Sequence, residues 1–183
     1  YGPLNVFVDS SGRVTAAGKA RKLRSWDANG VPLWSYELAH TSNRTSLRHG
    51  ASTEGDFILS STFNGLDEAF DATGVLLWMR WLPVQEEPDP AGGTMLRVPG
   101  PGHAGTYVAS DGSFIVQGTR GNQVVVLGRD GSQLWKSEVF PTKPGYPDGG
   151  HYNPGANTVL ATPDGKYVIA GFADAVIRIF ERS

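Results

Sequence analysis

The sequence predicts an all-β fold assembled from four copies of one four-strand repeat. Three observations support this prediction. One glycine turn recurs four times before a short apolar run, a second glycine turn precedes a tryptophan three times, and no segment shows the capped period of an amphipathic helix. The repeats are expected, within one domain spanning 1–183, at about residues 4–39, 50–82, 104–140 and 157–183.

The first turn of each repeat ends in a glycine, the residue that most readily accepts a positive φ. These glycines are Gly12, Gly55, Gly112 and Gly165. Six residues after each of them lies a small residue, namely Gly18, Ser61, Gly118 and Gly171. A small residue at the end of a second strand lets a neighbouring backbone approach closely. Gly18, Gly118 and Gly171 are therefore predicted to be structural positions of the repeat.

A second glycine turn lies four residues before a tryptophan in three of the repeats. The pairs are Gly30 with Trp34, Gly74 with Trp78, and Gly131 with Trp135. A polar residue such as Asp71 before the glycine tolerates the turn geometry and hydrogen-bonds its own backbone. The tryptophans recur with the repeat, so we expect them to fill the wedge between neighbouring sheets rather than to stack on a ligand.

The third repeat shows the expected strands most clearly, at Gly105–Ser110, Ser113–Gly118, Gln123–Gly128 and Gln133–Val139. Its second strand is continuously apolar, as expected for a strand covered on both faces. Its fourth strand alternates, as expected for an outer strand with one wet face. Repeated four-strand meanders of about 45 residues are typical of a β-propeller, so we expect these sheets to be its blades.

The run from Ala69 to Trp78 (AFDATGVLLW) resembles the tryptophan-docking motif of pyrroloquinoline-quinone-type (PQQ-like) propellers. The resemblance covers all four repeats loosely and is specific at the three turns before the tryptophans. It implies blades that circle an axis, in a family that includes quinone-dependent alcohol dehydrogenases, outer-membrane assembly lipoproteins and surface proteins. The chain departs from the dehydrogenases because it has four repeats and lacks their vicinal cysteine pair. We therefore expect neither quinone catalysis nor an organic cofactor.

The last repeat supplies only three expected strands, Thr158–Thr162, Lys166–Phe172 and Ala175–Glu181, so the outer strand of this blade is expected to be absent. An apolar third strand left at an edge is a template for pairing. The favoured interpretation is a part of a larger propeller, with further blades in the same polypeptide. The alternatives are self-association through strand donation at the open edge, and a closed four-blade monomer with one three-stranded blade.

Three histidines, His49, His103 and His151, each precede the first strand of a repeat. Such connections cross a propeller face near the axis, where three imidazoles could bind Zn²⁺ or Cu²⁺. Their distances from the following turn glycine differ, however, and loop histidines that bond backbone groups are the commoner case. Both readings stay open.

Two long connections carry the other candidate residues. The first, Pro83 to Gly102, is expected to be irregular, and its Glu86 and Glu87 are either calcium ligands or part of a solvated acidic loop. In the second, Pro141 to Asn157, Tyr146 and Tyr152 suit contact with a protein or a glycan, and equally suit covering the blade end.

Composition narrows the function classes. The chain has 16 Lys and Arg against 18 Asp and Glu, giving a net charge of −2, which argues against a nucleic-acid footprint. The basic run Lys19, Arg21, Lys22 and Arg24 is expected to be a solvated strand face rather than an anion site. Cysteine is absent, which excludes disulfides and thiolate sites. No stretch approaches the ~18 apolar residues of a membrane span.

The sequence therefore predicts a non-catalytic propeller scaffold for binding or assembly. Its expected partners are a protein, a carbohydrate or further blades. Abundant Gly and Asp and one sequon at Asn43 point to a location outside the cytoplasm. The alternative is the C-terminal part of a larger PQQ-like enzyme whose active residues lie upstream.

Overall fold

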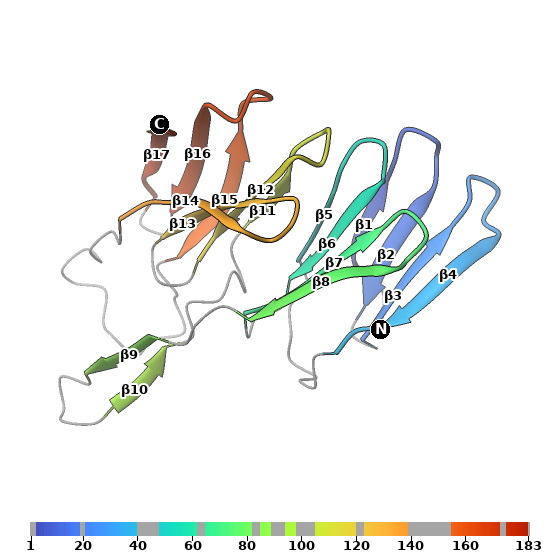
Figure 1. Cartoon of the computed structure of the whole chain (residues 1–183), viewed down its shortest axis with the longest axis horizontal. Helices are drawn as coiled ribbons and strands as arrows, with labels where there is room; N and C mark the ends of the chain where they lie inside the picture. The colour runs from blue at the N-terminus through green and yellow to red at the C-terminus, as the bar shows by residue number, and fades with distance from the viewer. Residues whose placement is uncertain are drawn as a thin grey trace.

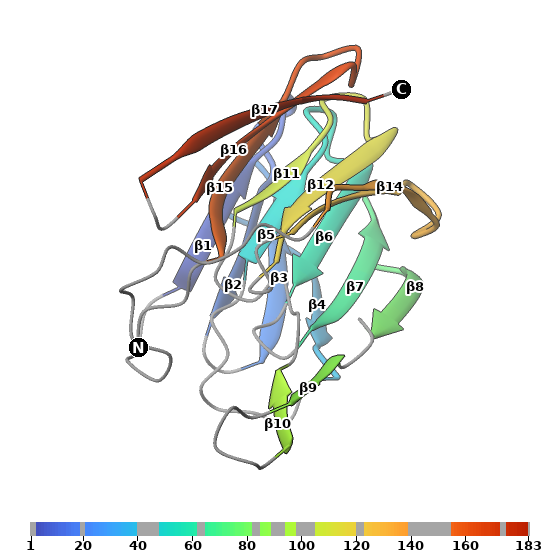
Figure 2. The same cartoon turned by 90° about the vertical axis from the view of Figure 1, so that its left-hand side faces the viewer.

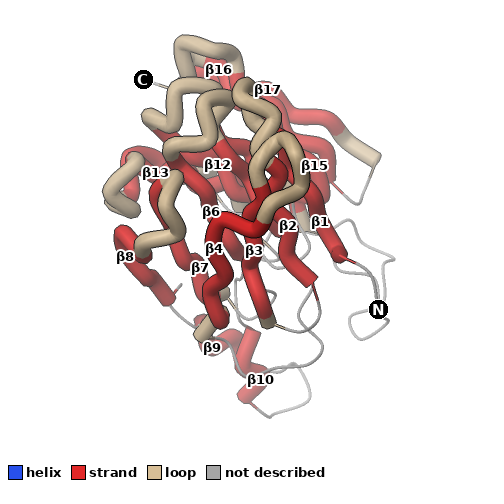
Figure 3. The backbone as a smooth tube through the Cα atoms, turned by 90° about the vertical axis from the view of Figure 1, so that its right-hand side faces the viewer, coloured by secondary structure: helices blue, strands red, loops and turns tan. Residues whose placement is uncertain are grey.

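Four of the five antiparallel β-sheets in the described part of the chain stand side by side in chain order (Figure 1). The computed structural model describes residues 3–18, 21–39, 48–61, 65–81, 85–88, 94–97, 105–119, 123–138, 155–172 and 175–182. These residues contain strands and turns and no helix (Figure 3). The all-β, propeller-like architecture predicted from the sequence is confirmed, and the four sheets are called blades 1 to 4.

Each blade is a meander whose strands pair in sequence order. Blade 1 contains β1 (Pro3–Val8), β2 (Val14–Gly18), β3 (Lys22–Trp26) and β4 (Pro32–Glu37). Blade 2 contains β5 (Arg48–Ala51), β6 (Phe57–Ser61), β7 (Leu66–Asp71) and β8 (Leu76–Trp81). Blade 3 contains β11 (Thr106–Val108), β12 (Phe114–Gly118), β13 (Val124–Gly128) and β14 (Gln133–Lys136). Blade 4 contains β15 (Ala156–Ala161), β16 (Tyr167–Phe172) and β17 (Ile177–Glu181), and no fourth strand among the described residues.

The connection between blades 2 and 3 is more regular than the sequence predicts. It contains a separate two-stranded sheet of β9 (Gln85–Pro88) and β10 (Thr94–Arg97), which lies apart from the blades in Figure 1. The expectation of an irregular stretch from Pro83 to Gly102 was therefore wrong for these eight residues. Acidic residues and proline are depleted in strands, so the composition of β9 concealed the pairing.

The blades form a row in which only neighbours pack on each other. The first strands make the inner line, because β5 contacts both β1 and β11, and β11 also contacts β15. Blade 1 and blade 4 stand at opposite ends of this row in Figure 1, and Figure 2 views the row from the blade 4 end. We call the face that each blade turns toward the next its leading face and the opposite face its trailing face.

Three apolar cores lie between these faces. Between blades 1 and 2, Ala17 and Leu23 meet Ile58 and Phe70. The second core joins blades 2 and 3, and the third joins blades 3 and 4. Strands in the middle of the row are consequently buried on both faces, as β12 is along its whole length. Outer strands such as β8 alternate between half-buried and exposed residues.

The tryptophans of the outer strands reach from one blade to the next. Trp34 Nε1 donates a hydrogen bond of 3.0 Å to Ala72 O, and Trp78 Nε1 donates one of 2.7 Å to Arg129 O. Trp135 packs against Phe180 of blade 4 with ring centroids 5.6 Å apart. The indoles therefore brace neighbouring blades, in the wedge that the sequence assigns to them.

The strand pairing shifts the first repeat by one residue relative to the glycine spacing. Trp34 pairs with Ser25, which pairs with Thr15, whereas Trp78 pairs with Ala69, which pairs with Leu59. Counting along the strands from these pairs places Ala17, rather than Gly18, level with Ser61, Gly118 and Gly171. The cause is a shorter first turn in blade 1, which closes from Arg13 O to Asp9 N, while the turn in blade 2 closes from Phe57 O to Ser52 N.

Candidate functional site

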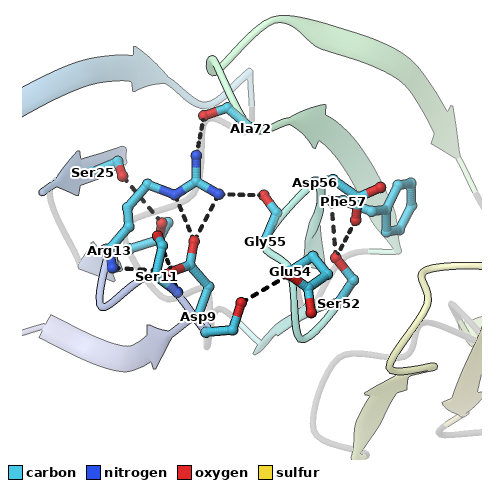
Figure 4. A network of polar contacts seen from close by, with 12 residues as sticks. Asp9, Ser11, Arg13, Ser25, Ser52, Glu54, Gly55, Asp56, Phe57 and Ala72 are labelled. Atoms are coloured by element: carbon cyan, nitrogen blue, oxygen red, sulfur yellow. Dashed lines mark hydrogen bonds and ion pairs between the residues drawn. The ribbon is translucent and has the colours of Figure 1, made fainter. Parts of the chain in front are cut away.

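The turn end of the blades carries a polar network that joins blade 1 to blade 2 (Figure 4). Arg13 pairs with the buried Asp9, whose carboxylate lies 2.7 Å from the guanidinium. The same guanidinium donates to Ala72 O at 2.8 Å and to Gly55 O at 2.7 Å. Burial raises the pKa of Asp9, but hydrogen bonds from Ser11 and Arg13 outweigh burial and hold that pKa below its ordinary value. Asp9 is therefore a charged structural anchor.

Each junction between neighbouring blades has one guanidinium at its turn end. Arg129 of blade 3 lies over the ring of Phe57 at 5.2 Å and forms an ion pair of 3.0 Å with Asp56 of blade 2. Arg182 of blade 4 lies over Phe114 of blade 3 at 5.4 Å. In blade 1 the position of these phenylalanines is occupied by Arg13 itself. The repetition indicates that the turn end is a brace between blades rather than a ligand site.

The loop end of blades 2 and 3 has a different character, because polar side chains are fully buried there. Gln117 Nε2 on β12 donates to Ser61 Oγ on β6 and to Asp67 Oδ1 on β7, both at 3.0 Å. Glu68 points to the other face of β7, where its Oε1 accepts the N–H of Ala39 at 3.1 Å. These residues lie where blade 2 meets blade 3 on one face and blade 1 on the other.

Several oxygens of this cluster have no hydrogen-bond partner among the residues that the structure describes. They are Ser60 Oγ, Asp67 Oδ2, Glu68 Oε2 and Gln117 Oε1. Burial raises the pKa of Asp67 to about 6, against smaller opposing effects of Ser61, Gln117 and Arg80. Burial also raises the pKa of Glu68, against the N–H of Ala39 and the charge of Arg21. Asp67 and Glu68 have no exposed surface, so neither touches a ligand in this conformation.

The predicted metal ligands fall mostly outside the described residues. His49 lies on β5, where its backbone pairs with Ser60, and its side chain is outside the described part. His103 and His151 are outside it altogether. The described residues contain no group of three or more metal-ligating side chains. The Zn²⁺ or Cu²⁺ site stays a prediction.

The predicted loop sites are in a similar position. Glu86 and Glu87 lie on β9, opposite Leu96 and Met95 of β10 in the strand register. Their side chains are outside the described part, so the calcium site stays a prediction. Tyr146 and Tyr152 also lie outside the described residues.

The basic run lies on β3 and the turn before it. Lys22 and Arg24 are exposed on the trailing face of blade 1, as expected for a solvated strand face. Arg21 lies 3.4 Å from Glu37, and Lys19 is outside the described residues.

Sequence reasoning missed one surface, an apolar stripe along β8. Leu77, Met79 and Trp81 alternate with half-buried residues, and Met79 and Trp81 are 51% and 59% exposed. Blade 1 has Ser35 and Glu37 at the last two of these positions, and blade 3 has Lys136 and Glu138, all exposed. The alternation in LLWMRW was the available signal, but the repeat assigned it to an ordinary outer strand.

This stripe lies on the strand that ends its sheet, because β8 follows β7 at the edge of blade 2. Outer strands are protected against pairing by charged side chains. Blades 1 and 3 have an exposed charged residue on their outer strands, Glu37 and Lys136, whereas the charged residue of β8, Arg80, is half-buried and donates to Gly131 O. The stripe is defined as Leu77, Met79 and Trp81. Leu77 has exposed counterparts in Leu33 and Leu134, whereas Met79 and Trp81 are apolar where the other two outer strands are polar.

The comparisons with known proteins support the fold. In the comparison with solved structures, 1183 chains match. One is BamB from Moraxella catarrhalis, with a TM-score of 0.63 at 20% sequence identity. The alignment covers 97% of this chain and 45% of that one, so the chain spans less than half the length of its structural relative. No protein-family profile and no curated protein sequence matches the chain.

At this identity the likeness establishes the propeller fold alone, and the chain aligns with part of the longer BamB chain. None of the described segments is a helix able to cross a bilayer.

Proposed function

We propose that this chain is a non-catalytic propeller scaffold that binds another protein through the β8 stripe, outside the cytoplasm. The observation that carries the proposal is the exposure of Met79 and Trp81 on an edge strand, where blades 1 and 3 carry polar residues. Large exposed apolar side chains that lie side by side mark interaction surfaces. The extracytoplasmic location rests on the composition and on the resemblance to PQQ-like proteins.

The geometry favours an extended partner segment. An edge strand offers unpaired N–H and C=O groups, to which another strand adds, while pockets and stripes select its alternate side chains. On β8 the outward side chains recur at every second residue, from Leu77 to Trp81. A partner strand with apolar residues at the same period would bury this stripe.

The proposal can be tested by photo-crosslinking in cells that produce the protein. A photoreactive phenylalanine analogue replaces Trp81 in one variant and Glu138, the corresponding residue of blade 3, in a matched control. We expect a protein adduct from position 81 that competes with the unmodified chain, and none from position 138. Adding Met79→Ser, which copies Ser35 of blade 1, is expected to remove most of the adduct.

Equal adducts from positions 81 and 138, or an adduct that is insensitive to Met79→Ser, would contradict the proposal. Folding is checked separately, because both positions are exposed and their replacement should leave the unfolding transition of the chain unchanged.

A further inference from the structure

The turn from Asp27 to Val31 in blade 1 has the same backbone geometry as the tryptophan-receiving turns of blades 2 and 3. Gly30 N donates to Asp27 O at 3.0 Å, Gly74 N donates to Asp71 O at 3.1 Å, and Gly131 N donates to Gly128 O at 3.0 Å. The φ angles of the three glycines are 82°, 82° and 80°. Three equivalent turns therefore present the same surface to the blade before them.

Two of these surfaces are occupied and one is open. A Cβ atom added to Gly74 would lie 2.6 Å from the Trp34 ring, and one added to Gly131 would lie 3.1 Å from the Trp78 ring. Around Gly30, no atom of the described residues lies within 4 Å of that position. The Gly30 turn of blade 1 thus presents the kind of surface on which an indole packs in blades 2 and 3, and no described indole lies on it. We call this surface the seat at Gly30.

The apolar face beside this seat is also uncovered. Strand pairing places Val8 of blade 1 level with Val108 of blade 3, because Val8 pairs with Val14 as Val108 pairs with Ile115. Val8 is 58% exposed, whereas Val108 is 7% exposed beneath the leading face of blade 2. The trailing face of blade 1 therefore has the pattern of a blade face that packs against a preceding blade.

Charge distinguishes the partner that this face would accept. Arg24 and Glu68 hold the same position, since each precedes the residue that pairs with the tryptophan of its blade. In blade 2, Glu68 accepts a hydrogen bond from Ala39 and lies close enough for its charge to act on Tyr36, two residues after Trp34. In blade 1 this position is Arg24, with Lys22 exposed beside it. In a blade packed against blade 1, an acidic residue at the position equivalent to Tyr36 would complement the charge of Arg24.

We propose that the trailing face of blade 1 is a docking site for the outer strand of a further propeller blade, one that carries a tryptophan followed two residues later by Asp or Glu. The indole fills the seat at Gly30, and the acid faces Arg24. The outer strands of blades 2 and 3 do not have this sequence, because Arg80 and Ser137 follow Trp78 and Trp135 at that distance. The site is separate from the β8 stripe, so either proposal can fail alone.

An NMR titration of the ¹⁵N-labelled chain tests this site with designed β-hairpin peptides whose second strand contains Trp-Ser-Glu. We expect saturable shifts of the Gly30 and Val31 amides and no change at Gly74 and Gly131, whose seats are occupied. A hairpin with Trp-Ser-Lys should bind about tenfold more weakly, because the change replaces an attraction to Arg24 by a repulsion. A hairpin with Ala-Ser-Glu should not shift Gly30.

Two variants of the chain serve as controls. Arg24→Glu alters an exposed side chain and should reverse the preference between the Glu and Lys hairpins. Gly30→Asn keeps a residue that tolerates positive φ but fills the seat, and should abolish the shifts. Gly30 shifts that are absent at high hairpin concentration, or equal for the two hairpins, would overturn the proposal. So would equal shifts caused by the unlabelled chain, which would make a second copy the occupant.

Discussion

The two ends of the junction between blades 2 and 3 differ in how completely their polar groups are hydrogen-bonded. At the turn end, the polar groups of Trp78 and Arg129 are paired with backbone carbonyls and with Asp56. At the loop end, Asp67 and Gln117 are completely buried and share one hydrogen bond. Each also keeps an oxygen that has no partner within the described part of the chain. The polar groups of the turn end are thus hydrogen-bonded. At the loop end, the desolvation free energy of the buried polar groups is only partly offset by hydrogen bonds.

This difference separates the features that recur with the repeat from those that are specific to one blade of this protein. Indole docking recurs at successive junctions, as the pairs of Trp34 with Ala72 and Trp78 with Arg129 show. The buried carboxyls of β7 have no counterpart in blade 3, where Val124 and Val125 hold the corresponding positions. Repetition therefore indicates a structural role, and departure from repetition indicates where the chain has been specialised.

The largest expected effect comes from removing an indole at the satisfied end. Trp78→Ala deletes the hydrogen bond to Arg129 O and opens a cavity beside Gly131, so the free energy of unfolding should fall by about 3–4 kcal/mol. Urea denaturation followed by circular dichroism measures this loss. Trp81→Ala is the matched control on the same strand and should change stability by less than about 0.5 kcal/mol. Similar losses for the two variants would contradict the assigned roles.

At the loop end, Asp67→Asn should instead stabilise the protein at neutral pH. The folded pKa of Asp67 is raised from its ordinary value of 3.8 to about 6, so the folded state binds more protons than the unfolded state between these values. Stability consequently falls as pH rises from about 4 to about 6, and the full penalty, about 3 kcal/mol, is present above pH 7. Asn is neutral throughout and avoids it.

The measurement is the free energy of unfolding of both proteins between pH 4 and pH 8. The advantage of Asp67→Asn should be greatest at pH 8 and disappear toward pH 4, where the carboxyl of the wild type is protonated in the folded chain. An advantage that does not change with pH would show that Asp67 is not the titrating group. Arg80 and Glu68 are unchanged in the variant, which isolates the effect of Asp67.

The sequence was sufficient for the turn end because its signals are local and repeated. Gly74 and Trp78 are four residues apart, and the same spacing recurs around Gly131. The origin of the guanidinium at the first junction was not predictable, because Arg13 donates its hydrogen bond to Ala72 O, 59 residues away. There the guanidinium comes from the preceding blade, whereas at the second junction Arg129 supplies it from the following blade.

The loop end and the β8 stripe escaped prediction for a different reason. The acidic residues Asp67 and Glu68 in LDEAF are typical of a solvent-exposed strand, and they are buried only because a blade packs on each face of β7. Met79 and Trp81 fit the alternation of any outer strand, and only comparison with Glu37 and Glu138 shows that their surface is unusual. Burial set by neighbours distant in sequence leaves no local pattern to detect.

A smaller effect distinguishes the occupied turn from the open one. Gly74→Ala and Gly30→Ala both place a side chain at a φ of 82°, so both lose about 1 kcal/mol to backbone strain. Only the first also drives a Cβ into the Trp34 ring, which should cost about 2 kcal/mol more. The difference between the two midpoints in urea measures this contact. Equal midpoints would mean that the turn of blade 2 yields and that the indole seat is not rigid.

The smallest expected effect is confined to one turn. Asp71 Oδ1 accepts hydrogen bonds from Thr73 N at 2.8 Å, Thr73 Oγ1 at 2.7 Å and Val75 N at 3.0 Å. Burial is the largest single influence and raises the pKa of Asp71, but the hydrogen bonds together outweigh it and hold the pKa below its ordinary value. The stabilisation is therefore present above the unfolded pKa and is lost as pH falls through the folded one.

Asp71→Ala should accordingly lower the free energy of unfolding by about 1 kcal/mol at pH 7 and by less at pH 3, while Asp71→Asn, which keeps an acceptor oxygen, should retain most of it. Thermal unfolding at the two pH values provides the measurement. The turn holds Gly74 in place for Trp34, so the alanine variant should also weaken the indole contact. A loss that is the same for Asn and Ala would show that the negative charge, rather than the acceptor oxygen, stabilises this turn.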